Sequence, residues 1–160
     1  MKSPDNESII TFFYAPGANH DEKHREEFYD ELREGIDRYK QNKIYLLGDS
    51  DARLGEYSED KDINGNFIGN KNKSLFMGLL EYTGLKYLNR IFERGKATYE
   101  IWGKKRSIID AALTNRIKQV ENFEVKPQIL GANPLTAHKI IQLTLKFNSD
   151  TQARERKKKI

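Results

Sequence analysis

The 160-residue chain contains no cysteine. This absence excludes disulfide bonds and thiolate metal sites, and it is compatible with a reducing compartment. The chain also has no run of about 18 apolar residues, and residues 1–8 are polar, so we expect neither a membrane span nor a signal peptide. The length fits one domain, which buries roughly 70% of its unfolded surface without cross-links. We therefore expect an intracellular protein, in the nucleus or the cytoplasm.

The chain has little excess charge of either sign. It carries 28 Lys and Arg against 24 Asp and Glu, a formal net charge of +4. Most of the excess lies in one segment, Arg154-Glu155-Arg156-Lys157-Lys158-Lys159. Because the rest of the chain is close to neutral, charge alone supports nucleic-acid binding only weakly. A solvated disordered tail explains this segment, and the alternative is a tail that contacts phosphates or acts as a targeting signal.

Hydrophobic patterning in the first half predicts two strands that flank a helix. Ser8–Tyr14 is nearly continuous in apolar character, which is typical of a strand buried on both faces. Asp21–Lys40 spaces its apolar residues as an amphipathic helix does. Lys43–Leu47 predicts a second buried strand, ended by Gly48. A long loop is expected over residues 50–71, which are rich in Gly, Asn and Asp.

The second half predicts one more helix and then strands. Lys73–Tyr82 carries apolar residues on one face, and Thr83-Gly84 is a typical helix end. Four further strands are expected, at residues 85–89, 98–102, 107–113 and 139–147. The order strand, helix, strand, helix and then several strands favours an α/β sandwich with mixed sheets.

Two aspartates follow the second predicted strand directly. Asp49 and Asp51 are one residue apart, and in an extended segment this spacing puts both carboxylates on the same side. Such a pair can share a hard cation or hold a water molecule for attack. An Asp-rich turn without function explains the same residues.

A further carboxylate falls on a strand that is expected to be buried. Asp110 follows Ser107-Ile108-Ile109, and an unpaired carboxylate there would be costly. His138 is the natural partner, because an Asp bonded to one imidazole nitrogen fixes the tautomer and leaves the other nitrogen free to act. The alternative is two unrelated polar residues on separate strands.

Four short segments together resemble the endonuclease/exonuclease/phosphatase family. They are Tyr14-Ala15-Pro16, Gly48-Asp49-Ser50-Asp51-Ala52, Ser107-Ile108-Ile109-Asp110 and Thr136-Ala137-His138-Lys139. The closest match is the endonuclease module that non-LTR retrotransposons carry ahead of their reverse transcriptase. This subtype rests on the predicted helix ending at Gly84, on residues 85–89 and on Thr98.

The resemblance covers residues 8–147 and corresponds to the C-terminal part of the family domain. It implies an α/β fold, an incomplete four-layer α/β sandwich with mixed, largely antiparallel sheets. We accordingly expect a truncated domain over residues 8–148, after a disordered N-terminus at 1–7 and before a basic disordered tail at 149–160.

What the resemblance implies about activity is a Mg²⁺-dependent phosphodiesterase that nicks DNA. Asp49 would prepare the attacking water and contact the metal ion, while His138, paired with Asp110, would stabilise the phosphate. The residues that would hold the substrate phosphate are Tyr14, Asp51, Thr98 and Ser107.

Three departures from the family pattern weaken that expectation. Asp51 stands where the family has Asn, and an ionised Asp accepts hydrogen bonds only and repels phosphate. Ala137 replaces an Asp that lies beside the metal ion in the family. The family's N-terminal strands, with an Asn and the metal-binding Glu, have no counterpart here. We therefore expect weak or absent binding of Mg²⁺ or Mn²⁺, and trace activity or none.

Two alternatives to this site remain open. The acidic residues of the 50–71 loop could act as metal ligands or form a solvated turn; they are Glu56, Glu59, Asp60 and Asp62. The domain could also be a non-catalytic remnant that binds protein or nucleic acid, with the basic turn Lys104-Lys105-Arg106 as one contact. Such a remnant would pair with a complementary N-terminal segment or self-associate, because the absent strands leave an open sheet edge.

Overall fold

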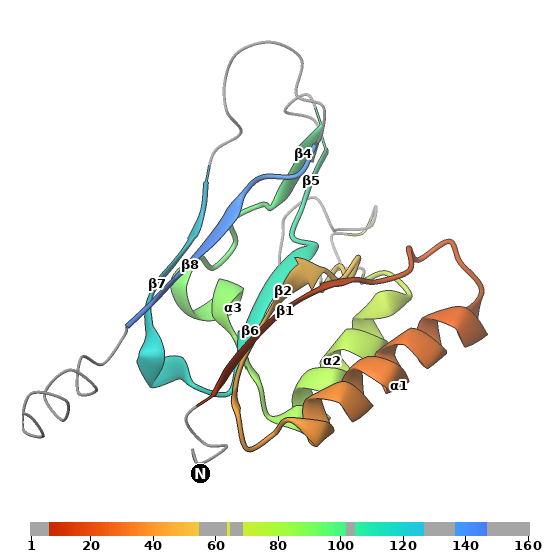
Figure 1. Ribbon diagram of the computed structural model, residues 1–160. Coiled ribbons are helices and arrows are strands. Elements are labelled where there is room, and N and C mark those ends of the chain that lie inside the picture. Colours follow the sequence, from red (N-terminus) through yellow and green to blue (C-terminus); the bar gives the residue numbers. More distant parts are fainter. Residues whose placement is uncertain (1–6, 55–63, 65–68, 102–104, 127–136, 147–160) are drawn as a thin grey trace, which may run out of the picture.

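A computed structural model describes residues 7–54, 64, 69–101, 105–126 and 137–146. A mixed four-stranded sheet in the order β1-β2-β6-β3 forms the centre, with two hairpins beside it, β4–β5 and β7–β8 (Figure 1). The elements are β1 Ser8–Tyr14, α1 Glu22–Arg38, β2 Lys43–Asp49, α2 Asn72–Thr83, β3 Lys86–Tyr87, α3 Leu88–Phe92, β4 Tyr99–Ile101, β5 Lys105–Ser107, β6 Asp110–Thr114, the 3₁₀ turn Ile117–Gln119, β7 Val120–Val125 and β8 Ile141–Leu145.

The expected fold class is confirmed. Strands β1 and β2 run parallel, and every other described pair of strands is antiparallel. Helices α1 and α2 cover one face of the central sheet, and the β7–β8 hairpin packs on the other, so the described residues form an α/β sandwich (Figure 1). No helix among the described residues is long and apolar enough to cross a membrane.

Both long helices form where the sequence predicts, with bounds that differ from the prediction by one or two residues. At the start of α1, the Asp21 carboxylate accepts a hydrogen bond from the backbone N–H of His24, which satisfies one of the free amides of the first turn. Helix α2 closes at Gly84, whose φ of 67° is the left-handed conformation that glycine adopts most easily. The helices bury Tyr29, Ile36 and Phe76 against the sheet.

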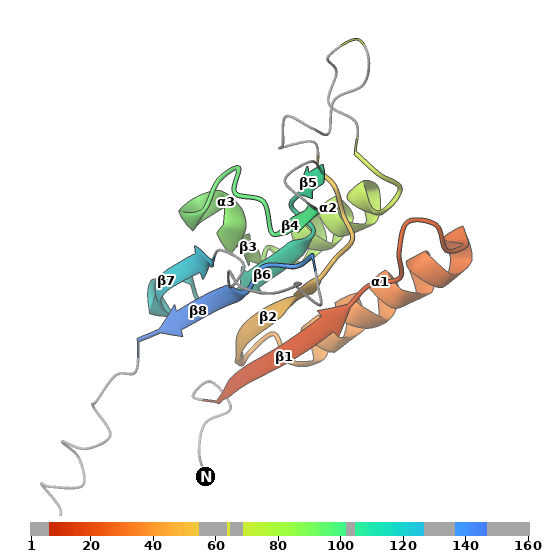
Figure 2. The same ribbon diagram turned by 90° about the horizontal axis from the view of Figure 1, so that it is seen from above.

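The interpretation of Ser8–Tyr14 as a strand is confirmed, but the prediction that this strand is buried on both faces is wrong. Among the described elements β1 pairs only with β2, so it is the outer strand of the sheet (Figure 2). Phe13 is buried beneath the helices, whereas Ile10, Phe12 and Tyr14 are 55%, 77% and 77% exposed. A continuous apolar run looks the same whether its second face is covered or left open.

The prediction that Gly48 ends the second strand is wrong. Strand β2 continues through Gly48 to Asp49. Gly48 pairs with Phe13 of β1, and a Cβ at this position would lie 1.9 Å from the Phe13 carbonyl oxygen. The glycine is therefore required by a close approach of two backbones, which also aligns Tyr14 of β1 with Asp49 of β2.

Two strand predictions in the second half were partly wrong, and one strand was not predicted. Residues 107–113 are divided between β5 and β6, residues 85–89 form a two-residue strand followed by α3, and β7 was missed altogether. The β7–β8 register shifts between Val120 and Asn122, and this bulge interrupts the regular alternation that marks a strand. The other predictions fit with shorter bounds: the 98–102 strand is β4, and the 139–147 strand is β8.

Candidate active site

The ends of β2 and β6 bring two carboxylates together. Asp49 is the last residue of β2, Asp110 is the first residue of β6, and the two are direct partners in the antiparallel register. Directly opposed residues of an antiparallel pair project to the same face, so both side chains emerge side by side. This face is the one that bears Ile10, Phe12 and Tyr14, since Tyr14 is aligned with Asp49.

His138 reaches this pair from a short segment that runs along β4. The carbonyl of Ala137 accepts a hydrogen bond from Glu100 N–H, and Lys139 N–H donates to the carbonyl of Thr98, so the backbone on both sides of the histidine is fixed. The ring of Tyr99 meets the His138 ring at an interplanar angle of 77°, with centroids 5.0 Å apart.

The expected pair of Asp110 and His138 forms. His138 Nδ1 lies 3.0 Å from both carboxylate oxygens of Asp110, and its Nε2 lies 3.8 Å from Asp49 Oδ2. Asp110 therefore sets the orientation of the imidazole and directs Nε2 towards Asp49. One ligand atom from each of Asp49, Asp110 and His138 lies within 4.8 Å of the others, a grouping that could hold a metal ion.

Burial makes both carboxylates harder to ionise. Burial raises the pKa of Asp49 above its usual value, the hydrogen bond from the Asp51 backbone N–H opposes this rise, and the negative charge of Asp110 adds to it. Burial also raises the pKa of Asp110, although the hydrogen bond to His138 lowers it. Desolvated carboxylates close together favour a bound cation or a bound proton between them.

Thr98 lies behind this site and is fully buried. Its hydroxyl accepts hydrogen bonds from the backbone N–H groups of Ile109 and Asp110, each at 3.0 Å. A hydrogen bond from the same hydroxyl also lowers the pKa of Asp110. Ser107 is buried as well, and its carbonyl accepts from Thr98 N–H. The prediction that these two side chains contact a phosphate stays a prediction, whereas the contacts of the Thr98 hydroxyl position Asp110.

Asp51 does not join Asp49 as the spacing suggested. The chain turns at Asp51, whose φ of 42° departs from the extended conformation on which the prediction depended. The Asp51 carboxylate accepts a hydrogen bond of 2.5 Å from Ala18 N–H, in the loop between β1 and α1. Its own N–H donates to Asp49 Oδ1. The two aspartates are thus linked by a turn rather than projected side by side.

Sequence reasoning missed Asn89, a buried side chain that supports β6. Its amide nitrogen donates to the carbonyl of Asp110, and its amide oxygen accepts from Ala112 N–H. These bonds replace a missing neighbouring strand at the first residues of β6. A polar residue at the end of a predicted apolar strand was the available signal.

The positive side chains next to His138 are already paired. Lys139 Nζ lies 3.0 Å from one oxygen of Glu100, and Arg106 Nε lies 3.4 Å from the other. The hydrogen bond from Lys139 holds the pKa of Glu100 below its usual range. Several other candidates fall outside the described residues: Thr136, Lys104, the four acidic residues of the 55–63 loop and the basic tail.

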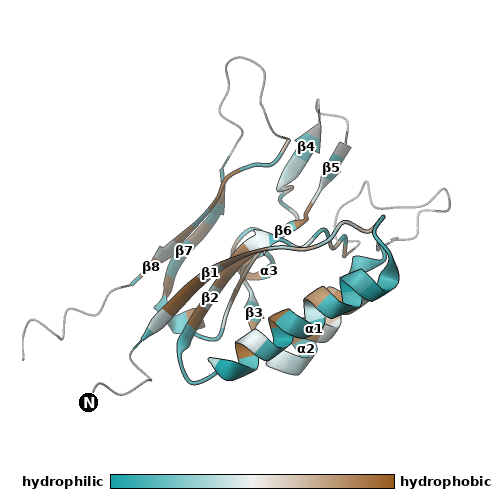
Figure 3. Cartoon of the chain, turned by 45° about the vertical axis from the view of Figure 1, so that its right-hand side comes forward, coloured by the Kyte–Doolittle hydropathy of each residue, from teal (hydrophilic) through white to brown (hydrophobic). Residues whose placement is uncertain are grey.

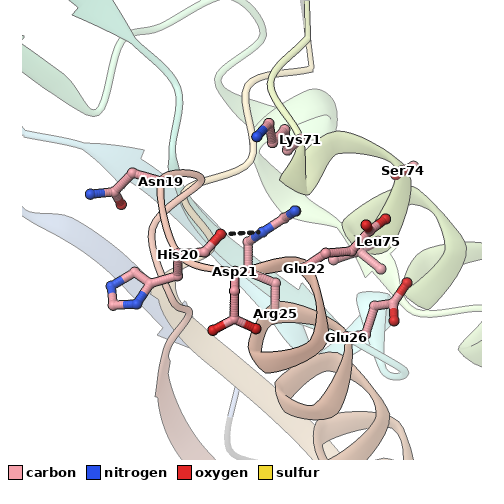
Figure 4. Close-up of a pocket in the computed structure, with 9 residues that line it drawn as sticks. All are labelled: Asn19, His20, Asp21, Glu22, Arg25, Glu26, Lys71, Ser74 and Leu75. Carbon is pink, nitrogen blue, oxygen red and sulfur yellow. Dashed lines mark hydrogen bonds between the residues drawn. The ribbon is translucent and has the colours of Figure 1, made fainter.

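A cavity of about 540 Å³ is lined by none of the three clustered residues. It lies between the start of α1 and the start of α2 (Figure 4). The buried Arg25 lines it, donating from Nε to the His20 carbonyl and from a terminal nitrogen to Asn72 Oδ1. Glu22, Glu26 and Lys71 also line the cavity, so its charge is mixed and selects no sign of ligand.

No protein-family model and no curated protein matches the sequence. Solved structures do match the fold. One is the endonuclease domain of TRAS1, a telomere-specific non-LTR retrotransposon, with a TM-score of 0.63 and 15% identity over 88% of this chain and 59% of that chain. A second is the 3′-5′ exonuclease NExo from Neisseria meningitidis, with a TM-score of 0.64 and 17% identity over 86% of this chain and 61% of that chain.

This chain has an endonuclease/exonuclease/phosphatase-like fold. A further match is the 3′ phosphatase NExo from Neisseria bound to a product DNA hairpin, with a TM-score of 0.60 and 16% identity over 78% of this chain and 54% of that chain. The chain therefore spans between 54% and 61% of the length of these structures. At this level of identity the likeness shows the fold; two of these structures are described as nucleases and one as a 3′ phosphatase.

Proposed function

We propose that this chain carries part of a metal-dependent phosphodiesterase site for DNA, with trace activity or none by itself. The observation that carries the proposal is the convergence of Asp49, Asp110 and His138 from three separate segments. Two further observations support it: nuclease structures share the fold, and so does a 3′ phosphatase that is bound to a product DNA hairpin.

The donor set fits a divalent cation. Two carboxylates and one imidazole lie within reach of one another, and carboxylate oxygens are the ligands that Mg²⁺ and Mn²⁺ prefer. When bound, such an ion supplies Lewis-acid stabilisation of charge on a phosphate oxygen. The Nδ1 atom of His138 is already engaged by Asp110, and its Nε2 is assigned to the phosphate in this proposal, so the two carboxylates are the ligands and they leave the coordination shell incomplete. Weak binding is therefore the expected result.

The chain's own residues have separate roles in this proposal. Asp49, with its raised pKa, accepts a proton from the attacking water. Asp110 keeps the His138 imidazole oriented, so that Nε2 donates a hydrogen bond to the phosphate. The Tyr14 hydroxyl, at the exposed end of the neighbouring strand, holds a phosphate oxygen. Thr98 positions Asp110, and Asp51 fixes the turn after Asp49.

Titration with Mn²⁺ and Mg²⁺ by calorimetry tests the metal site. We expect binding no tighter than about millimolar for the wild type and its loss in Asp49→Ala. Asp30→Ala, which removes an exposed carboxylate of α1, is the matched control and should bind as the wild type does. Equal heats from wild type and Asp49→Ala would contradict the metal site.

Nicking of supercoiled DNA tests the activity. We expect trace Mg²⁺-dependent nicking or none from the wild type, because the ligand set is incomplete. Robust nicking that disappears in Asp49→Ala and persists in Asp30→Ala would show that the site is complete as it stands, and would overturn the low activity proposed here.

A second candidate function is that of a non-catalytic binding module. The observation that favours it is the row of exposed apolar side chains on β1. Large apolar side chains gathered on one open strand mark an interaction surface more often than a solvated face. Metal binding distinguishes the two functions, since a binding module has no need of Asp49 as a ligand.

A further inference from the structure

Two of the three histidines in the chain lie side by side at the start of α1. His20 and His24 are four residues apart in the sequence, and their ring centroids are 5.7 Å apart with an interplanar angle of 39°. A spacing of four residues at a helix brings two side chains onto one face, where two imidazoles can bind one metal ion. The pair shares no residue with the candidate active site.

Hydrogen bonds hold the backbone beneath both rings. His20 N–H donates to the Gly17 carbonyl, and the His20 carbonyl accepts from Nε of the buried Arg25. The N–H of His24 donates to the capping carboxylate of Asp21. Because the backbone at both positions is already fixed, little conformational freedom is left to lose when an ion joins the two rings.

Both rings are accessible to an ion from solvent. His20 and His24 are exposed, and Figure 4 shows the His20 ring turned away from Arg25 and the cavity. Figure 3 shows the start of α1 in hydrophilic colours, next to the end of β1. Exposed rings can turn about their side-chain bonds to meet an incoming ion.

The distance between the rings fits a shared ion. Two imidazole nitrogens at about 2.0–2.1 Å from one tetrahedral ion place their ring centroids roughly 5 Å apart. A small rotation of the two rings takes them from 5.7 Å to that separation. Imidazole suits Zn²⁺, Ni²⁺ and Cu²⁺, whereas Mg²⁺ prefers oxygen ligands. The pair should therefore select other ions than the carboxylates Asp49 and Asp110 do.

Acidic side chains balance the charge that an ion would add. The start of a helix is the positive end of its dipole, which disfavours a cation there. Asp21 caps this end and Glu22 lies in the first turn, so two carboxylates offset the dipole. Among the described residues, no further Asp, Glu or His makes a group of three with the pair. Water therefore completes the coordination, and the ion stays exchangeable.

We propose that His20 and His24 form a second metal site, which binds an ion of the Zn²⁺ class through one nitrogen of each ring. Such an ion links the loop between β1 and α1 to the first turn of α1. The Ala18 N–H of the same loop donates to the Asp51 carboxylate, so an occupied site also restrains a contact beside the candidate active site. The inference does not depend on the proposed function.

Titration with Zn²⁺, followed by NMR of the imidazole C–H resonances, tests the site. The chain has three histidines, so three sets of ring resonances report separately, and His20→Gln and His24→Gln assign two of them. At about pH 7.5, where neutral imidazole is available as a ligand, the resonances of both rings should shift with one shared midpoint. Excess Mg²⁺ should leave them in place.

The midpoint read from the His20 resonances measures the affinity of each variant. His24→Gln should weaken Zn²⁺ binding at least about tenfold, because one of two protein ligands is lost. Glu31→Gln, which changes an exposed residue of α1, is the matched control and should bind as the wild type does. The double variant His24→Gln/Glu31→His keeps three histidines but moves one about 10 Å along the helix. It should bind as weakly as His24→Gln.

Asp49→Ala separates this proposal from the proposed function. The variant removes a ligand of the candidate active site and should leave the shared midpoint of His20 and His24 unchanged. A midpoint that weakens in Asp49→Ala would show that the two rings are not an independent site, and would overturn the proposal.

Three further results would overturn it. The first is a wild-type titration in which the His20 and His24 resonances shift at different Zn²⁺ concentrations or do not shift. The second is an unchanged His20 midpoint in His24→Gln, which would mean that each ring binds by itself. The third is wild-type affinity in His24→Gln/Glu31→His, which would mean that the number of histidines matters and their spacing does not.

Discussion

The two faces of the central sheet differ in how completely they are covered. On one face, α1 and α2 bury residues from all four strands, among them Phe13 of the outer strand β1. On the other, the β7–β8 hairpin buries Tyr45 and Ala112 but does not reach β1. Asp49 and Asp110 lie on this second face, so the candidate site borders an open surface. Among the described residues, the core is therefore more completely covered on the helix side of the sheet than around the site.

The solved structures that share this fold are longer than this chain, which spans 54–61% of their length. The helix-covered face has the buried aromatic contacts of a finished core, such as Phe76 against Tyr87 with ring centroids 5.5 Å apart. The exposed face of β1 has no such contact among the described residues. In the part of the chain that the structure describes, the three side chains of the site meet while the second face of β1 is exposed.

The largest expected effect comes from matched truncations on the two faces. Phe76→Ala removes a ring that is 1% exposed and should lower the free energy of unfolding by about 3–5 kcal/mol. Phe12→Ala, at 77% exposure, should change it by no more than about 0.5 kcal/mol. Urea unfolding at the lowest usable protein concentration measures both. Similar losses at both positions would show that the outer face of β1 is covered in solution.

A smaller effect is expected at the residue that supports the site from behind. Thr98→Val keeps the shape of the side chain but leaves two buried N–H groups, of Ile109 and Asp110, without their acceptor. We expect a loss of about 1–3 kcal/mol in the free energy of unfolding. Thr98→Ser keeps the hydroxyl and should cost about 0.8 kcal/mol, the value of one buried methyl group. Thermal unfolding of both variants measures these losses. A larger loss in Thr98→Ser than in Thr98→Val would contradict this role.

The smallest expected effect is a pH dependence of folding stability that arises from Asp49. Burial, and then the charge of Asp110, raise the pKa of Asp49, so the folded chain holds this proton more tightly than the unfolded chain does. The carboxyl's favourable contribution to folding is therefore complete below its unfolded pKa of about 4 and is lost as the pH rises through its folded pKa. Asp49→Asn has no such proton and keeps an oxygen for the Asp51 N–H.

The melting temperature of Asp49→Asn relative to wild type should accordingly increase as the pH is raised from about 4 to about 7. Asp30→Asn, which changes an exposed carboxylate paired with Arg33, serves as the control and should show no comparable trend. A difference that decreases with rising pH would mean that Asp49 is stabilised as an anion in the folded chain.

Local signals in the sequence were enough for the helices and for the first two strands. Helix α1 begins at a capping aspartate, α2 ends at a left-handed glycine, and both bury a periodic apolar face. These properties depend on neighbours three or four residues away, so a pattern in the sequence records them. The pairing of Asp110 with His138 was also anticipated, because a buried carboxylate needs a partner.

What the sequence by itself determined, then, is the α/β class, the two long helices and the identity of the residues that meet at the strand ends. Only the tertiary structure decided that β1 lies at the border of the sheet with Phe12 exposed, that Gly48 serves a close backbone approach, and that Asp51 turns away from Asp49. Each of these depends on which distant segment packs against the residue. An apolar run, a glycine or an aspartate pair carries no local record of that neighbour.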